Sequence, residues 1–263
     1  MSDAPVLYEC KDSIGLMTLN RPENRNSMTP EVLQGVVDTI AQVRADPDVR
    51  CLVITGKGRS FCAGADFKSN IQHNPGGREL LSNERSFEMY KPFLSVLEVE
   101  VPVIGALNGH AIGGGMGLAL VCDIRVANQE SRYGANFTRL GLHPGMATTY
   151  LLPRIVGMPK AAELLLTGRL MSGAEAAEIG LMNYAVAEDQ VFDKAWGLAE
   201  EVAQCAPIAN RWTKQSLFRN MDWSPRGAAQ YEAELQSRTL ETKDHREGVK
   251  ALLEKRTPDF KGN

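Results

Sequence analysis

The fold is decided by the stretch Pro102-Val-Ile-Gly-Ala-Leu-Asn-Gly-His-Ala-Ile-Gly-Gly-Gly-Met-Gly117, in which an apolar strand leads through small residues into a helix. The apolar strand at 51–55 leads in the same way into Phe61-Cys-Ala-Gly-Ala-Asp-Phe67. Small residues let a ligand atom approach the backbone, where N–H groups are fixed before charge develops on that atom. The two loops therefore predict a site in which backbone donors stabilise a negatively charged oxygen.

The glycine run at 113–115 also has a simpler explanation, because such a run often lets a strand and a helix pack closely. It does not fit the G-x-G-x-x-G pattern of dinucleotide sites, and the chain has no G-x-x-x-x-G-K-[ST] sequence. Nucleotide-binding interpretations thereby lose their main support.

The composition is that of a globular protein with a substantial core. Of the 263 residues, 43% are hydrophobic and 23% are charged, and the formal net charge is −3. This charge argues against a nucleic-acid partner, which normally faces a basic surplus. Because the chain shows neither a signal peptide pattern nor a stretch of about 18 apolar residues, we expect a cytoplasmic protein with no membrane partner.

The cysteine pattern and several missing motifs argue against further classes of site. The five cysteines are an odd number without C-x-x-C, which favours reduced thiols over a disulfide framework or a zinc site. The sequence also lacks H-E-x-x-H and G-x-S-x-G, the patterns of metalloproteases and of serine hydrolases.

Strand-like and helix-like segments alternate in the first half of the chain, which predicts an α/β fold with crossover connections. From Ala147 onward the pattern is helical, and the last helices have mixed faces that need a covering surface. We expect strands at 6–10, 14–19 and 51–55, a polar, mobile segment at 68–86, and helices at 31–43, 86–97, 147–156, 159–166, 173–179, 189–204, 207–220 and, with interruptions, 225–254.

A series of motifs resembles, in its order, the crotonase family of enoyl-CoA hydratases and isomerases. The resemblance covers nearly the whole chain, and several independent blocks contribute to it. The motifs are Asn20-Arg-Pro-Glu-Asn-Arg-Asn26, Ile54-Thr-Gly56, Phe61-Cys-Ala-Gly-Ala-Asp66, Ala106-Leu-Asn-Gly-His-Ala-Ile-Gly-Gly-Gly115, Cys122-Asp-Ile124, Leu140-Gly-Leu-His-Pro-Gly145, Leu152-Pro-Arg-Ile-Val-Gly157, Leu166-Thr-Gly168, Ala174-Glu-Ala-Ala177 and Gly180-Leu-Met-Asn183.

The resemblance implies an α/β spiral of ββα units with a C-terminal helical oligomerisation region. We expect an acyl-CoA-binding core at 1–200 and a trimerisation region at 201–263, so that the protein is a homotrimer or a hexamer of two trimers. Coenzyme A enters as part of an acyl-CoA thioester substrate, and no separate cofactor or metal is expected.

The resemblance also assigns the site residues. The N–H groups of Ala65 and Gly114 form the oxyanion hole for the thioester carbonyl. Phe137 makes the acyl pocket more apolar and suited to a bulky or aromatic acyl group. The residues expected to bind the substrate or its coenzyme A part are Arg25, Ala63, Asp66, Phe67, Lys68, Gly115 and Phe137.

The chain departs from the family where hydratases carry the two glutamates that activate water. Gly117 and Phe137 stand there, and Gly145 replaces an aspartate of dienoyl-CoA isomerases and an aryl-CoA dehalogenase. None of these residues transfers a proton, so ordinary hydratase activity is expected to be weak. Acid–base candidates are Glu88, Tyr90 and His110, although Tyr90 also fits a packing role and His110 a bracing role.

The leading hypothesis is an acyl-CoA lyase or isomerase that stabilises a thioester enolate with non-standard acid–base residues. Two alternatives keep the same loops. One is a non-catalytic acyl-CoA carrier or sensor, and the other is a thioester hydrolase or decarboxylase, which needs the oxyanion hole but not the two glutamates.

Overall fold

The computed structural model describes residues 4–66 and 81–263. The predicted site residues Phe67 and Lys68, and most of the segment expected to be mobile, lie outside the described residues. The main sheet, in spatial order, consists of β1 (Val6–Lys11), β2 (Ile14–Leu19), β3 (Cys51–Gly56), β5 (Val103–Leu107), β7 (Ile124–Asn128) and β10 (Tyr184–Val186). The second sheet consists of β4 (Ser60–Cys62), β6 (His110–Ile112), β8 (Arg132–Gly134) and β9 (Met171–Ser172).

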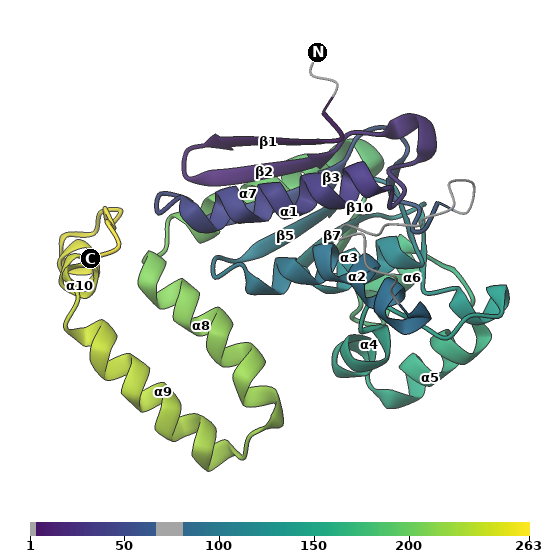
Figure 1. Cartoon of the computed structure of the whole chain (residues 1–263). Helices are drawn as coiled ribbons and strands as arrows, with labels where there is room; N and C mark the ends of the chain where they lie inside the picture. Colours follow the sequence, from purple (N-terminus) through teal and green to yellow (C-terminus); the bar gives the residue numbers. More distant parts are fainter. Residues whose placement is uncertain (1–3, 67–80) are drawn as a thin grey trace.

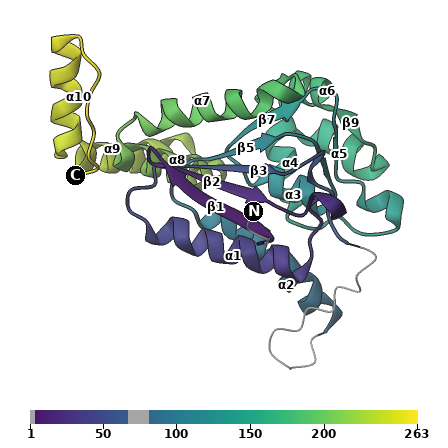
Figure 2. The same ribbon diagram turned by 90° about the horizontal axis from the view of Figure 1, so that it is seen from above.

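The central strand β3 is buried on both faces, as its continuous apolar run predicts. Its side chains alternate between two cores, with Leu52 and Ile54 in one and Val53 in the other. Helix α1 (Pro30–Ala45) covers the first face and α7 (Val191–Ala203) covers the second, and the two helices lie on opposite sides of the sheet (Figure 2).

The strand connections confirm the ββα spiral. All pairs of the main sheet except β1–β2 are parallel, as are β4–β6 and β6–β8. Strands β3, β5 and β7 are each followed along the chain by a short strand of the second sheet, and β6 leads into α3 (Gly114–Leu120). Both small-residue loops therefore leave the same edge of the main sheet, because parallel strands share their carboxyl ends.

One helix begins earlier than expected, and the last helical region is interrupted as expected. Helix α2 (Ser82–Leu94) begins earlier than residue 86, because Glu84 accepts a hydrogen bond from Leu81 N–H at 2.9 Å and fixes the first turn. The expected helix start at residue 86 is therefore wrong. Near the C-terminus, Thr242 accepts a hydrogen bond from His245 N–H and starts a separate helix.

The other helices are α4 (Thr148–Val156), α5 (Met158–Thr167), α6 (Gly173–Glu178), α8 (Pro207–Arg219), α9 (Pro225–Leu240) and α10 (Lys243–Glu254), with the 3₁₀ turns η1 (Pro22–Asn24), η2 (Ser95–Glu98), η3 (Phe137–Leu140), η4 (Glu188–Gln190) and η5 (Asn220–Asp222). No helix in the described ranges is both long and apolar enough to cross a membrane.

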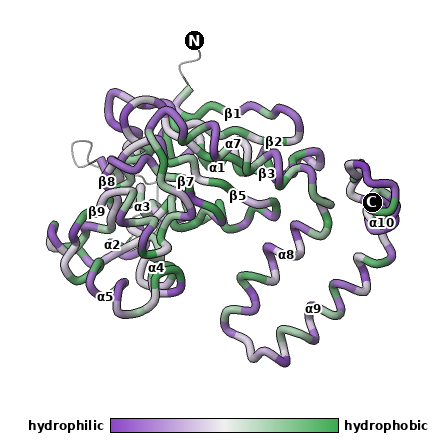
Figure 3. The backbone as a smooth tube through the Cα atoms, turned by 180° about the vertical axis from the view of Figure 1, so that it is seen from behind, coloured by the Kyte–Doolittle hydropathy of each residue, from purple (hydrophilic) through white to green (hydrophobic). Residues whose placement is uncertain are grey.

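Helices α8, α9 and α10 project from the body as an arm (Figure 1), which we call the C-terminal arm. Apolar and polar residues alternate along it (Figure 3), and Leu217, Leu252 and Leu253 are among its exposed apolar side chains. Mixed helix faces without a covering surface agree with the sequence pattern. The division of the chain at residue 200 stays a prediction.

A buried ion pair attaches α8 to the body. Lys214 Nζ lies 2.8 Å from Asp123 Oδ2 and donates a hydrogen bond to Val101 O at 2.9 Å. The same carboxylate oxygen accepts a hydrogen bond from Val103 N–H at 2.7 Å. The side chains of Lys214 and Asp123 are only 8% and 18% exposed, so each charge depends on the other for compensation.

We expect Lys214→Ala to lower the free energy of unfolding by about 3 kcal/mol, because the substitution leaves the Asp123 charge nearly buried without its partner. Urea denaturation measures this loss. Arg238→Ala is the control, since it removes an exposed ion pair with Glu234 and should cost about 0.5 kcal/mol. Equal effects of the two substitutions would contradict the anchoring role of Lys214.

Candidate functional site

The loop after β4 is held in place by the segment before α1. Met28 N–H donates to Gly64 O at 2.8 Å, and Ala63 N–H donates to Arg25 O at 3.0 Å. Met28 and Ala65 form an isolated parallel bridge. These bonds fix the backbone at 63–65 and leave the opposite edge of this short extended segment facing the second loop.

The two small-residue loops meet backbone to backbone. A Cβ atom on Gly64, whose φ is +85°, would lie 3.0 Å from Gly114 N, and one on Gly114 would lie 3.6 Å from Gly64 Cα. A Cβ atom on Gly115 would overlap Cys62 O and lie 2.7 Å from the carbonyl carbon. Glycine is therefore required at 64 and 115 for the close approach of the two backbones, and Gly115 faces the first loop.

The contact leaves two backbone donors side by side. Gly113 N–H donates to Gly134 O at 2.9 Å, and Gly117 N–H donates to Gly113 O at 3.1 Å. In the part of the chain that the structure describes, the N–H groups of Ala65 and Gly114 have no acceptor. Two rigid donors on touching loops can bind one oxygen atom that carries negative charge.

A methionine fills the space next to Gly117. A Cβ atom on Gly117 would overlap Met146 Cβ and lie 2.9 Å from Met146 Cγ. Met146 is 1% exposed and has a φ of 60°, and the next residue, Ala147, has a φ of 54°. Thr148 holds this strained turn, because its hydroxyl and its N–H both donate to Gly145 O, at 2.8 and 3.1 Å.

A tyrosine fills the space next to Gly145. A Cβ atom on Gly145 would overlap Tyr90 Oη and lie 2.6 Å from Tyr90 Cζ. Tyr90 lies on α2, which packs against α3, and both Tyr90 and Phe137 are half-buried against the main core. Gly117 and Gly145 are thus covered by a thioether and a phenol.

The other predicted acid–base residues have partners of their own. Glu88 forms an ion pair with Lys91 one turn further along α2. His110 Nδ1 accepts a hydrogen bond from Arg132 N–H at 2.9 Å, so the ring braces β6 against β8. Arg25 is exposed beside the first loop, and Asp66 follows Ala65 at its rim.

Thiol and metal chemistry find no support in the described residues. Burial raises the pKa of the Cys62 thiol to about 12, so this cysteine beside the loops stays protonated and unreactive at neutral pH. No group of three His, Cys, Asp or Glu side chains that could hold a metal occurs among residues 4–66 and 81–263.

Sequence reasoning missed Met28, Met146 and Asn136. Asn136 Oδ1 lies 3.5 Å from the position of a Cβ on Gly113, and its amide has no hydrogen-bond partner in the described chain. No local pattern marks these residues, because Met28 and Met146 enter the site only through tertiary packing, and a left-handed methionine is not expected from sequence.

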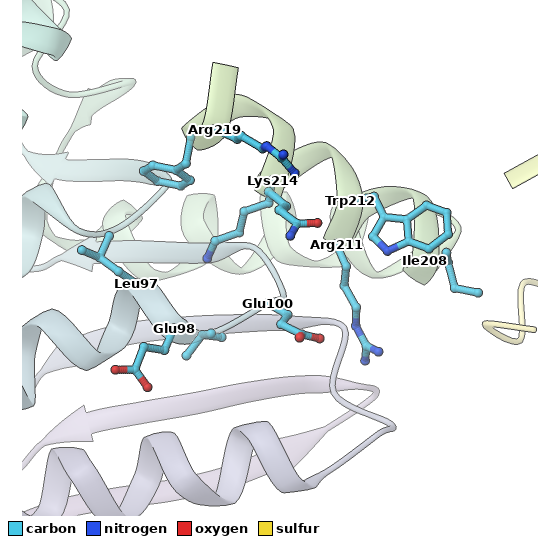
Figure 4. Close-up of a pocket in the computed structure, with 11 residues that line it drawn as sticks. Leu97, Glu98, Glu100, Ile208, Arg211, Trp212, Lys214 and Arg219 are labelled. Atoms are coloured by element: carbon cyan, nitrogen blue, oxygen red, sulfur yellow. The ribbon is translucent and has the colours of Figure 1, made fainter. Parts of the chain in front are cut away.

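A separate pocket of about 690 Å³ lies between η2 and α8 (Figure 4). Glu98 and Glu100 line one side, and Arg211 and Arg219 line the other. It contains none of the predicted site residues, and its walls belong to the junction of the C-terminal arm with the body.

Comparison with known proteins gives consistent matches. Residues 9–263 match the family described as enoyl-CoA hydratase/isomerase. The (E)-benzylidenesuccinyl-CoA hydratase of Thauera aromatica is 35% identical, with 98% of this chain and 99% of the relative covered. The crystal structure of an enoyl-CoA hydratase from Bacillus anthracis superposes with a TM-score of 0.92 at 32% identity, covering 98% of this chain and 100% of the other. A Mycobacterium smegmatis enoyl-CoA hydratase gives 0.88 at 26% identity, covering 97% and 98%.

We expect Gly115→Ala to lower the free energy of unfolding by about 2 kcal/mol or more, because the added methyl group overlaps the backbone of Cys62. Thermal or urea denaturation measures the change. Gly197→Ala in α7 is the matched control: nothing lies within 4 Å of its added methyl, and the replacement should stabilise the helix by about 0.5–1 kcal/mol. A Gly115→Ala protein as stable as the wild type would refute the close packing of the two loops.

Proposed function

This chain belongs to the enoyl-CoA hydratase/isomerase family of the crotonase superfamily, and from that premise we propose that it stabilises the enolate of an acyl-CoA thioester in an oxyanion hole made by Ala65 and Gly114. The observation that carries this proposal is the pair of N–H groups without acceptors on two touching loops. One such donor typically lowers a barrier by about 2.7–4 kcal/mol.

The acid–base chemistry of this enzyme is not that of an ordinary hydratase. A hydratase of this family holds one water between two carboxylates, and this chain carries Gly117 and Phe137 at the corresponding positions. The packing supports this difference, because Met146 already occupies the space that a side chain at 117 would need. Each missing proton-transfer group typically costs about 10²–10⁴-fold in rate.

The acyl pocket suits a bulky apolar or aromatic acyl group. Met146 beside Gly117 and the ring of Tyr90 beside Gly145 supply apolar surface, and Phe137 packs against the same core. One relative in Thauera aromatica is named for benzylidenesuccinyl-CoA, an aryl-bearing thioester. Apolar walls with few polar groups are the usual form of a site that binds such a ligand.

Coenzyme A enters this proposal as part of the substrate, with Arg25, Ala63 and Asp66 at the rim where it leaves the site. Arg25 is exposed and free to meet a phosphate. The exposed apolar side chains of the C-terminal arm, among them Leu217 and Leu252, support assembly as a homotrimer or a dimer of trimers. A cytoplasmic location remains an expectation from the sequence.

Gly114→Pro should abolish turnover of acyl-CoA thioesters and weaken their binding, because proline removes one of the two donors. The control is Gly114→Ala, which places the same Cβ against Met28 but keeps the N–H. Proline is tolerated at the first residue of a helix, where Gly114 stands, so α3 should persist. Turnover and calorimetric affinity for an acyl-CoA panel provide the measurement. Equal activity of the two variants would eliminate Gly114 N–H as a donor, and tight binding without turnover by the wild type would favour a carrier.

Crotonyl-CoA should be hydrated poorly, with kcat/KM well below about 10⁶ M⁻¹s⁻¹. The two substitutions Gly117→Glu and Phe137→Glu together should not suffice for efficient hydration, since a side chain at 117 collides with Met146. Adding Met146→Gly as well should raise hydration above that of the double variant, because glycine opens the space and adopts a φ of 60° without strain. Loss of the conjugated-thioester absorbance is followed for all variants. Efficient hydration by the wild type would overturn this account of the site.

A further inference from the structure

Among the described residues of the acyl site, Tyr90 carries a hydroxyl that forms no structural hydrogen bond. Its oxygen forms no hydrogen bond within the described residues, and it is not sealed from solvent as the unpartnered hydroxyl of Tyr8 is. A tyrosine that only packs gains nothing from such an oxygen. The hydroxyl is therefore available to a ligand.

The place of this hydroxyl is set by Gly145. A Cβ at that position would overlap Tyr90 Oη, so any residue other than glycine displaces the phenol. Gly145 does not have a positive φ, and backbone conformation does not demand glycine there. The requirement for glycine is thus steric, and it comes from Tyr90.

A short chain of contacts leads from the phenol to the oxyanion hole. Tyr90 touches Gly145, the next residue Met146 packs on Gly117, and Gly117 lies one helical turn after Gly114 on α3. The α-carbon of a thioester whose oxygen binds at Gly114 N–H lies one bond from that carbonyl. These contacts link the phenol to the helix whose first residue, Gly114, carries one of the two donors.

On the basis of the proposed enolate function, we propose that Tyr90 is the catalytic proton donor to the α-carbon of the thioester enolate. The Oη–H bond breaks and a C–H bond forms with the electron pair of the enolate, while the thioester carbonyl is restored. The resulting phenolate takes a proton from water. In the reverse direction the phenolate removes an α-proton, so the step is visible as hydrogen exchange.

The test is exchange of the α-protons of phenylacetyl-CoA for deuterium in deuterium oxide, followed by proton NMR, together with calorimetric affinity for the same thioester. Tyr90→Phe should slow exchange by about 10²–10⁴-fold and leave the Kd within about threefold. Tyr8→Phe, which removes an unpartnered hydroxyl outside the site, should exchange at the wild-type rate. Thermal unfolding should be unchanged for Tyr90→Phe, because its hydroxyl holds no partner.

Gly145→Ala gives an independent test, because it displaces the phenol without removing it. Its exchange should also fall, and the double variant with Tyr90→Phe should be no slower than the slower single variant, since both changes remove one function. The role of Tyr90 would be wrong if Tyr90→Phe exchanged the α-protons at the wild-type rate, or if weaker binding alone explained its slower exchange. Either outcome would leave the enolate function standing. No exchange by the wild type would overturn the enolate function, and this role with it.

Discussion

The close contact between the loops after β4 and β6 is the constraint on which the rest of the site depends. Gly64 and Gly115 bring two backbones to a distance that no side chain permits, and the two free N–H groups lie on the loops that meet there. The main sheet makes the contact achievable, because parallel strands deliver both loops to the same edge. A binding element made of backbone depends little on which side chains surround it, so the pocket walls can differ while the donors stay.

The side chains that cover Gly117 and Gly145 carry no carboxylate. Gly117 and Phe137 cannot transfer a proton, and Gly117 and Gly145 are covered by Met146 and Tyr90. The space next to each of these glycines is therefore filled, because a larger residue from elsewhere in the chain enters it. A carboxylate introduced at position 117 alone would collide with Met146.

Much of the fold followed from sequence, because its signals are local. The apolar run at 51–55 and the helical spacing at 31–43 each identified an element that the structure contains, β3 and α1. The start of α2 was missed, because Glu84 fixes it through one hydrogen bond that the helical spacing does not show. The oxyanion-hole assignment came from a family resemblance, and the covering roles of Met146 and Tyr90 depend on contacts between distant segments, which no single sequence displays.

The strained turn at Met146 and Ala147 determines which side chain lies next to Gly117. Two successive non-glycine residues with positive φ cost about 1–3 kcal/mol each, and the fold tolerates this where Thr148 ties the turn to Gly145. The turn keeps the Met146 side chain packed on Gly117. In the proposed function, an enolate formed next to this side chain would meet an apolar group on that side, and its protonation would depend on the polar groups that the protein places on the others.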